Sequence, residues 1–202
     1  MRIVSGMARG IRLSVPETGG VRPTEDKVKE SLFSTLGDLR GKRVLDLFSG
    51  SGALGLEALS RGAERVVLVE RDPRHCQVIR ENLSRVSKAM GGVAPETVEL
   101  LSCDAARAGA RLSAEAPFDF ILADPPYHCA PGDYGACALL KDPAWIRLAV
   151  PGAILVLEQE TGTLDVPWAP LSPWRLLRER SFGIRTLSYA TPAESAATEE
   201  EK

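Results

Sequence analysis

The sequence contains few of the residues that build disulfide-stabilised or metal-centred folds, with 4 cysteines and 2 histidines in 202 residues. The cysteines form no C-x-x-C pair, and no histidine stands at metal-ligand spacing from them, so the sequence predicts no metal site. A disulfide framework is rare in so long a chain with so few cysteines. We expect the four to be reduced and buried: Cys76, Cys103, Cys129 and Cys137.

The sequence also lacks a long hydrophobic run, since no apolar stretch approaches the roughly 18 to 20 residues that span a membrane. Its N-terminus shows no hydrophobic segment of the kind found in secretory signal peptides. With 44% hydrophobic and 26% charged residues, the composition is typical of a globular protein that buries a core. These features predict a cytoplasmic protein with no membrane partner.

An excess of positive charge is missing as well, because 25 Lys and Arg stand against 27 Asp and Glu. Taken as an average, this balance argues against a nucleic-acid-binding protein, since phosphate-binding surfaces are usually basic. The charges are unevenly distributed, however. Residues 1–43 hold nine basic and five acidic side chains, and residues 194–202 hold four acidic and one basic. The net charge therefore does not exclude RNA, provided that the basic N-terminal segment makes the contacts.

From residue 43 onward, apolar runs alternate with helical patterns. We predict strands at 44–48, 65–70, 97–102, 118–123 and 153–157, and helices at 53–60, 73–88, 105–114 and 136–149. Five strands separated by four helices imply βαβ units, and hence a parallel sheet with helices on both faces. Two further runs, 175–182 and 185–190, flank Gly183 without a helix between them, which predicts an antiparallel hairpin at the sheet edge.

The two ends of the chain follow other patterns. Loosely alternating apolar residues in the first fifteen positions predict a short β-hairpin or extended arm, and Thr24 is a good N-cap for a helix that follows. The last residues are rich in Ala, Glu, Ser and Thr, which is typical of disorder. We predict a basic arm and helix at 1–40, an α/β domain at 41–191 and a disordered acidic tail at 192–202.

A glycine-rich loop joins the first strand of the α/β domain to its first helix. Gly50, Gly52 and Gly55 match G-x-G-x-x-G, and Glu70 lies at the end of the next strand. In a doubly wound sheet this arrangement binds a nucleoside, because the glycines admit the ligand and the acid accepts hydrogen bonds from ribose hydroxyls. A dinucleotide fits the spacing, but its pyrophosphate would meet Asp46. A cationic ligand such as S-adenosylmethionine would be stabilised there.

A second motif, Asp124-Pro125-Pro126-Tyr127, ends the fourth predicted strand. The carboxyl ends of parallel strands lie at one edge of a sheet, so this motif is expected to face the same crevice as the glycine loop. Two prolines remove two N–H donors and leave a rigid turn of acceptors. Acceptors suit an exocyclic base amine, which Asp124 and the Pro125 carbonyl would orient for attack on a sulfonium methyl. Tyr127 would stack on the base.

These motifs resemble the class I S-adenosylmethionine-dependent methyltransferases that act on base amines, whose signature is [DNS]-P-P-[YFW]. The closer resemblance is to the bacterial small-subunit (16S) rRNA guanine-N2 methyltransferases of the RsmD type, and it covers roughly residues 1–190. The stretches that carry it are residues 2–6, Arg9-Gly10, Arg22-Pro23-Thr24, residues 28–33, residues 46–63 and residues 124–127.

The resemblance implies a Rossmann-like class I methyltransferase fold, S-adenosylmethionine as cofactor and the N2 amine of a guanine in 16S rRNA as acceptor. It also implies a monomer that acts on the small ribosomal subunit or its assembly intermediate. The catalytic residues would be Asp124, Pro125, Pro126 and Tyr127; the cofactor-binding residues Arg22, Thr24, Asp46, Phe48, Gly50, Ser51, Gly52, Glu70, Asp104 and Ala105; and the RNA-binding residues Arg2, Arg9 and Arg12. Asp104 also stands where a helix N-cap would precede Ala105, and the two roles are compatible.

Three other functions remain open from the residues alone. The glycine spacing permits an NAD-dependent oxidoreductase, although D-P-P-Y has no role in one. An adenine-N6 methyltransferase shares the tetrapeptide, but the chain has no inserted target-recognition domain of the DNA enzymes. A non-catalytic RNA-binding module is a third class. Binding of S-adenosylmethionine or NAD, and the activity of Asp124→Ala, discriminate among them.

Overall fold

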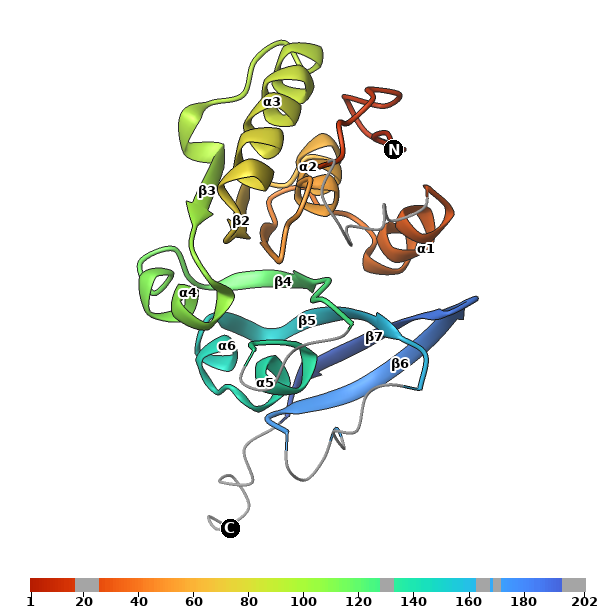
Figure 1. Cartoon of the computed structure of the whole chain (residues 1–202), viewed down its shortest axis with the longest axis vertical. Helices are drawn as coiled ribbons and strands as arrows, with labels where there is room; N and C mark the ends of the chain where they lie inside the picture. Colours follow the sequence, from red (N-terminus) through yellow and green to blue (C-terminus); the bar gives the residue numbers. More distant parts are fainter. Residues whose placement is uncertain (17–25, 128–132, 163–167, 169–171, 194–202) are drawn as a thin grey trace.

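A computed structural model of the protein describes residues 1–16, 26–127, 133–162, 168 and 172–193 (Figure 1). At its centre is a sheet of strand order β3-β2-β1-β4-β5-β7-β6, in which β1 to β5 are parallel and β7 is antiparallel to both its neighbours. Within the described residues the seven strands are β1 (Arg43–Leu47), β2 (Arg65–Glu70), β3 (Val98–Ser102), β4 (Phe118–Ala123), β5 (Ala149–Glu160), β6 (Trp174–Phe182) and β7 (Arg185–Pro192). The predicted parallel sheet with a C-terminal antiparallel hairpin is confirmed.

Helices cover both faces of the sheet. Successive residues of a strand point to opposite faces, and the central strands place apolar side chains on each. Val44, Val66 and Leu68 share one core cluster with residues of α1, α2 and α3, whereas Leu45 and Val67 pack with residues of α4, α5 and α6. The helical segments are α1 (Asp26–Leu36), α2 (Ala53–Ser60), α3 (Pro73–Ala89), η1 (Pro95–Thr97), α4 (Ala105–Arg111), α5 (Ala136–Lys141) and α6 (Ala144–Arg147). None of the described helices is long and apolar enough to cross a membrane.

One helix prediction is wrong. The segment 136–149 forms two short helices, α5 and α6, and its last residue begins β5, which is longer than the predicted 153–157. Asp142 leaves the helical backbone at φ −80° and ψ 112°, because the Pro143 ring disfavours a helical residue before it. The Asp142 carboxylate accepts the N–H of Ala144 at 2.9 Å and so starts the next turn.

The N-terminal segment folds back on itself and packs against α2. A single antiparallel bridge joins Arg2 and Arg12, so the predicted hairpin is one bridge rather than a ladder. The buried carboxylate of Glu57 accepts the backbone N–H groups of Val4 and Ser5, at 2.8 and 2.9 Å. The arm is therefore held by a carboxylate of the α/β domain and contributes to its core.

The predicted start of the first helix and the predicted start of the C-terminal tail lie next to residues that the structure does not describe. Thr24 and Arg22 lie outside the described residues, and α1 begins at Asp26. Residues 194–202 of the predicted tail also lie outside them. Pro192, the first residue of that predicted tail, is the last residue of β7, so the sheet extends slightly farther than expected.

The prediction that the cysteines are buried is wrong in part. Cys76 is a buried free thiol, but Cys103 is only half-buried and Cys137 is exposed. Cys137 lies in the first turn of α5 and lines a surface pocket there, so it is not turned into the core. Cys129 lies outside the described residues.

We expect Gly6→Ala to destabilise the protein more than Gly10→Ala, although both glycines are left-handed, with φ of +80° and +88°. A Cβ on Gly6 would lie 1.9 Å from the backbone oxygen of Ser60 in α2, whereas nothing lies within 4 Å of one on Gly10. Gly10→Ala should cost about 1 to 2 kcal/mol of unfolding free energy, and Gly6→Ala about 2 kcal/mol more. Denaturant unfolding measures both, and equal losses would contradict the packing of the arm on α2.

Candidate active site

The glycine loop leaves β1 through a run of left-handed residues. Phe48, Gly50 and Gly52 have φ of +59°, +55° and +77°, and Phe48 is the only non-glycine among the described residues with positive φ. Such a conformation is strained for an aromatic residue, and strain of this kind gathers at functional sites. A Cβ on Gly55 would lie 2.6 Å from a methyl group of Leu68, so the glycine lets α2 pack closely on β2 without displacing that side chain.

Asp46 lies beneath this loop near the end of β1, with 1% of its surface exposed. Its Oδ2 accepts the N–H of Gly55 at 2.9 Å. Burial raises the pKa of Asp46 to about 7; the hydrogen bond from Gly55 opposes this rise, and the nearby Glu70 carboxylate adds to it. A cationic ligand beside Asp46 would stabilise its ionised form.

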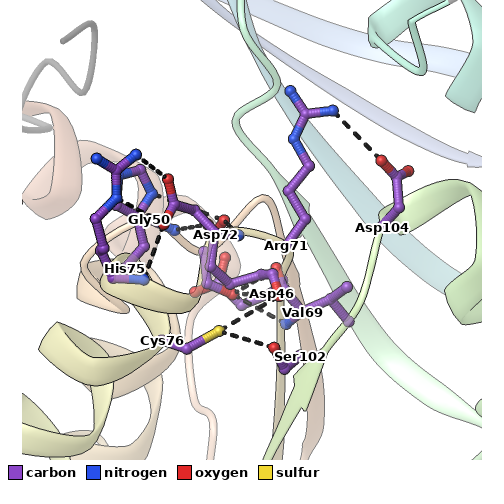
Figure 2. A network of polar contacts seen from close by, with 12 residues as sticks. Asp46, Gly50, Val69, Arg71, Asp72, His75, Cys76, Ser102 and Asp104 are labelled. Carbon is purple, nitrogen blue, oxygen red and sulfur yellow. Dashed lines mark hydrogen bonds and ion pairs between the residues drawn. The ribbon is translucent and has the colours of Figure 1, made fainter. Parts of the chain in front are cut away.

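Glu70, at the end of β2, ties the glycine loop to the segment that follows β2. Its Oε2 accepts the N–H of Gly50 and its Oε1 accepts the N–H of Asp72, each at 2.8 Å. Nδ1 of His75 lies 3.7 Å from Oε1, and Figure 2 shows Gly50, Asp72 and His75 gathered there. A carboxylate has about four acceptor sites, so Glu70 is able to hold the loop and still accept ligand hydroxyls.

Asp104 follows β3 and caps α4, because its Oδ1 accepts the N–H of Ala106 at 2.9 Å. The predicted N-cap is confirmed. Nη1 of Arg71, from the segment after β2, lies 3.4 Å from Oδ2 of Asp104 (Figure 2). This ion pair joins the ends of β2 and β3, and the buried Ala105 lies next to it in the chain.

The D-P-P-Y turn lies beside the end of β5. Ala123 and Leu157 are register partners, which places the next residues, Asp124 and Glu158, side by side at the carboxyl edge of the sheet. Oη of Tyr127 donates to Oε1 of Glu158 at 3.0 Å. Burial raises the pKa of Asp124 well above its usual range, and the Glu158 carboxylate raises it further.

A surface pocket opens between this turn, the start of α5 and the end of β5. Its lining includes Pro125, Pro126, Tyr127, Cys137 and Glu158. The structure thus sets the predicted catalytic turn in a concave surface, which is the usual form of a site for a small molecule or a single base.

Two charged residues of this site were not predicted from the sequence. Nη1 of Arg185 in β7 lies 3.1 Å from Oε1 of Glu158, which is 2% exposed. The signal for Glu158 was present in the sequence, since an acid directly after the apolar run 153–157 falls at the carboxyl edge of a parallel sheet. Nothing comparable marks Arg185, because the antiparallel hairpin brings it to that edge.

Tyr134, just before α5, connects the pocket to the glycine loop. Its ring stacks on that of Phe48, with 6.5 Å between the ring centroids. Its Oη donates to Oδ2 of Asp142 at 2.8 Å and accepts from Nε1 of Trp145 at 2.6 Å. No sequence motif identifies this contact, because the two aromatic residues lie far apart in the chain.

Asn82 of α3 is a further residue that the sequence did not single out. Its Nδ2 donates to the carbonyls of Ser14 and Ser51, at 2.9 Å each, so it joins the N-terminal segment to the glycine loop. Its signal is an amide on the buried face of an amphipathic helix. Arg22 and Thr24 follow Ser14 in the chain but lie outside the described residues.

The predicted site residues divide into two groups in space. The predicted cofactor-binding residues within the described part of the chain lie at the carboxyl ends of β1, β2 and β3, and the predicted catalytic turn lies at the end of β4. Arg2, Arg9 and Arg12 are exposed on the N-terminal segment that packs on α2, and Arg2 pairs with Asp26 at 2.8 Å. No contact among the described residues joins these arginine side chains to the strand ends.

We expect Asp46→Asn to gain stability relative to the unaltered protein as the pH rises. The folded pKa of about 7 exceeds the usual 3.8, so folding favours the protonated carboxyl, and ionisation between about pH 4 and 7 destabilises the fold. Asparagine keeps an acceptor for Gly55 and does not ionise. Unfolding without ligand at pH 4.5 to 8 should show a relative gain of about 3 kcal/mol across this range; parallel stability curves would contradict the raised pKa.

Three comparisons with known proteins agree on the relatives of this chain. A family model described as Conserved hypothetical protein 95 matches residues 1–191. Ribosomal RNA small subunit methyltransferase D from Haemophilus influenzae is 33% identical over 185 residues, which are 91% of this chain and 90% of that protein. Putative rRNA methyltransferase YlbH from Bacillus subtilis is 41% identical over 129 residues, which are 63% of this chain and 67% of that protein.

Solved structures extend this agreement to the fold. A hypothetical protein from Thermus thermophilus matches with a TM-score of 0.74 and 29% identity, covering 95% of this chain and 99% of that one. A putative methyltransferase from Escherichia coli matches with a TM-score of 0.71 and 31% identity, covering 96% and 99%. Residues 1–191, which the family model matches, contain the N-terminal segment, the glycine loop, the D-P-P-Y turn and the C-terminal hairpin. This chain therefore belongs to the Conserved hypothetical protein 95 family and is a homologue of ribosomal RNA small subunit methyltransferase D.

Proposed function

We propose that this protein transfers a methyl group from S-adenosylmethionine to the exocyclic N2 amine of a guanine in 16S rRNA. The observation that carries the proposal is the placement of the D-P-P-Y turn at the same sheet edge as the buried Asp46 and Glu70 carboxylates. The names of the homologues support an rRNA methyltransferase. The guanine N2 specificity rests on the resemblance and on the chemistry of the turn.

The residues around the glycine loop fit S-adenosylmethionine better than a dinucleotide. The backbone N–H groups of Gly50 and Gly55, which a phosphate would need, already donate to the carboxylates of Glu70 and Asp46. A pyrophosphate would also meet two carboxyl groups, whereas a sulfonium or ammonium group would be stabilised by them. When bound, S-adenosylmethionine supplies an electrophilic methyl group on a positively charged sulfur.

Each cofactor-binding residue has a role in this proposal. Asp46, Phe48 and the loop residues Gly50, Ser51 and Gly52 would surround the methionine end, and Glu70 would accept the ribose hydroxyls. Asp104 and Ala105 would contact the adenine while Asp104 continues to cap α4. Arg22 and Thr24 would close over the pocket.

The D-P-P-Y turn would hold and orient the target amine. The Asp124 carboxylate and the Pro125 carbonyl accept the two amine hydrogens, which favours a pyramidal nitrogen with an exposed lone pair. Pro126 keeps the turn rigid, and Tyr127 stacks on the base. The raised pKa of Asp124 suits it to take the proton that the amine releases after transfer.

The RNA would reach the site as an unstacked base whose backbone is held by the N-terminal segment. Arg2, Arg9 and Arg12 are exposed there and would contact phosphates. We further propose that the substrate is the small ribosomal subunit or its assembly intermediate, and that the enzyme is a cytoplasmic monomer. Sequence-independent affinity for RNA should be weak, because the net charge is −2.

We expect Asp124→Ala to lower the rate of methyl transfer by at least about 100-fold. The affinity for S-adenosylmethionine should change by less than about threefold, because Asp124 holds the amine and not the cofactor. Methyl incorporation into small-subunit RNA and calorimetric titration measure the two. Asp119→Asn is the control, since Asp119 is on the same strand and pairs with Lys42 at its opposite end. An active Asp124→Ala enzyme, or tight binding of NAD without S-adenosylmethionine binding, would overturn the proposal.

Mapping of N2-methylguanines in small-subunit rRNA tests the substrate directly. Cells without the gene should lack one such modification, the unaltered gene should restore it, and the Asp124→Ala gene should not. Unchanged rRNA would contradict the 16S assignment and leave the chemistry of the site open to another amine.

We expect Arg9→Ala to weaken RNA binding and to lower the slope of log affinity against log salt by about 1, because one phosphate contact is lost. Methyl transfer at saturating RNA should be unchanged. Arg147→Ala, which removes an exposed arginine from α6, is the control and should keep the slope of the unaltered protein. An unchanged slope in Arg9→Ala would place the RNA elsewhere.

A further inference from the structure

Glu158 has a combination of contacts that a purely structural carboxylate does not need. Its Oε1 accepts two hydrogen bonds, from Tyr127 Oη at 3.0 Å and from Arg185 Nη1 at 3.1 Å. Its Oε2 is buried and has no hydrogen-bond partner among the described residues. A buried carboxylate oxygen without a hydrogen-bond donor lowers the stability of the fold, typically by more than one ordinary hydrogen bond contributes. Such a cost is expected where a ligand supplies the missing donor.

The surroundings of Glu158 indicate what kind of donor that is. Glu158 lines the pocket together with Pro125, Pro126 and Tyr127. The prolines have no N–H, and the Tyr127 hydroxyl already donates to Oε1, so these neighbours offer Oε2 no hydrogen. The ligand atom that meets Oε2 must therefore carry its own N–H or O–H group.

The strand register fixes where this donor must lie relative to the target amine. Asp124 and Glu158 follow the paired residues Ala123 and Leu157, so the two carboxyl groups stand on adjacent strands at one edge. A base whose exocyclic amine is held by Asp124 would present a ring atom next to that amine toward the next strand. In guanine the amine is flanked by N1, which carries a hydrogen, and by N3, which does not, so the orientation with N1 toward Glu158 is the one that gives Oε2 a donor. The ring nitrogens beside the exocyclic amines of adenine and cytosine are acceptors.

We infer that Glu158 is a specificity-determining residue of the base pocket, and that its Oε2 accepts the N1–H of the target guanine while Asp124 and Pro125 hold the N2 amine. This inference rests on the proposed function and deepens it. A base without a hydrogen at this position would set its lone pair against the carboxylate and leave Oε2 unsatisfied. Sites built to accept a hydrogen bond reject analogues that lack the donor strongly.

Arg185 and Tyr127 act on Glu158 and not on the base. Both hydrogen bonds favour the ionised carboxylate, against the burial that raises the pKa of Glu158. Because both occupy Oε1, they fix the rotation of the carboxylate and direct the other oxygen away from themselves. The side chain is thereby preorganised as an acceptor before the RNA arrives.

The test uses small ribosomal subunits reconstituted with RNA that carries guanosine or 2-aminopurine at the mapped target position. 2-Aminopurine keeps the exocyclic 2-amine but has a bare lone pair at N1. The unaltered enzyme should prefer guanosine by at least about 100-fold in kcat/KM. Glu158→Gln should reduce this preference at least about tenfold, because a glutamine amide is able to donate to the bare N1. Glu179→Gln, on the exposed face of β6, should keep the original preference.

Each result has one meaning. An unaltered enzyme that methylates 2-aminopurine within about threefold of guanosine overturns the inference without any variant. So does a Glu158→Gln enzyme that is folded, binds S-adenosylmethionine and keeps the original preference. An unaltered enzyme that methylates neither base at N2 overturns the proposed function itself, and transfer to guanosine in the same assay separates the two failures.

Discussion

The hydrogen bond between the Glu70 carboxylate and the N–H of Gly50 is the interaction on which the site depends most. It closes the glycine loop onto the end of the neighbouring strand, and the second oxygen of the same carboxylate holds the segment after β2 at Asp72. Because the loop is held from β2, its left-handed residues keep their shape and α2 starts at a fixed point. A charge-assisted bond in a buried place is stronger than a neutral one, which suits it to this task.

Buried carboxylates recur throughout the molecule, and each is satisfied differently. Glu57 accepts two backbone N–H groups of the N-terminal arm and thereby makes the arm part of the core. Asp46 accepts one N–H from α2 and is left with a raised pKa that a cation would relieve. Glu158 is satisfied on one oxygen only. Of these three carboxylates, Glu57 has a donor on each oxygen, whereas Glu158 keeps one buried oxygen without a donor among the described residues.

Much of this site was predictable because its residues stand in local motifs. The glycine loop, Glu70 and the D-P-P-Y turn each follow a strand, and a parallel sheet brings such positions to one edge. The cap by Asp104 was also predictable from the helix start at Ala105. The contacts of Asn82 and Tyr134 were not, because their partners lie in segments remote in sequence and no spacing rule connects them.

The sequence by itself determined the order of strands and helices, the sharp turns and the chemistry of the acceptor-only tetrapeptide, because these depend on neighbours a few residues apart. The tertiary structure alone decided which side chains meet across strands. The register of β4 with β5 sets Asp124 beside Glu158, and the antiparallel insertion of β7 brings Arg185 to the same carboxylate. Such contacts arise from packing between distant segments, where desolvation and charge decide the protonation of each group.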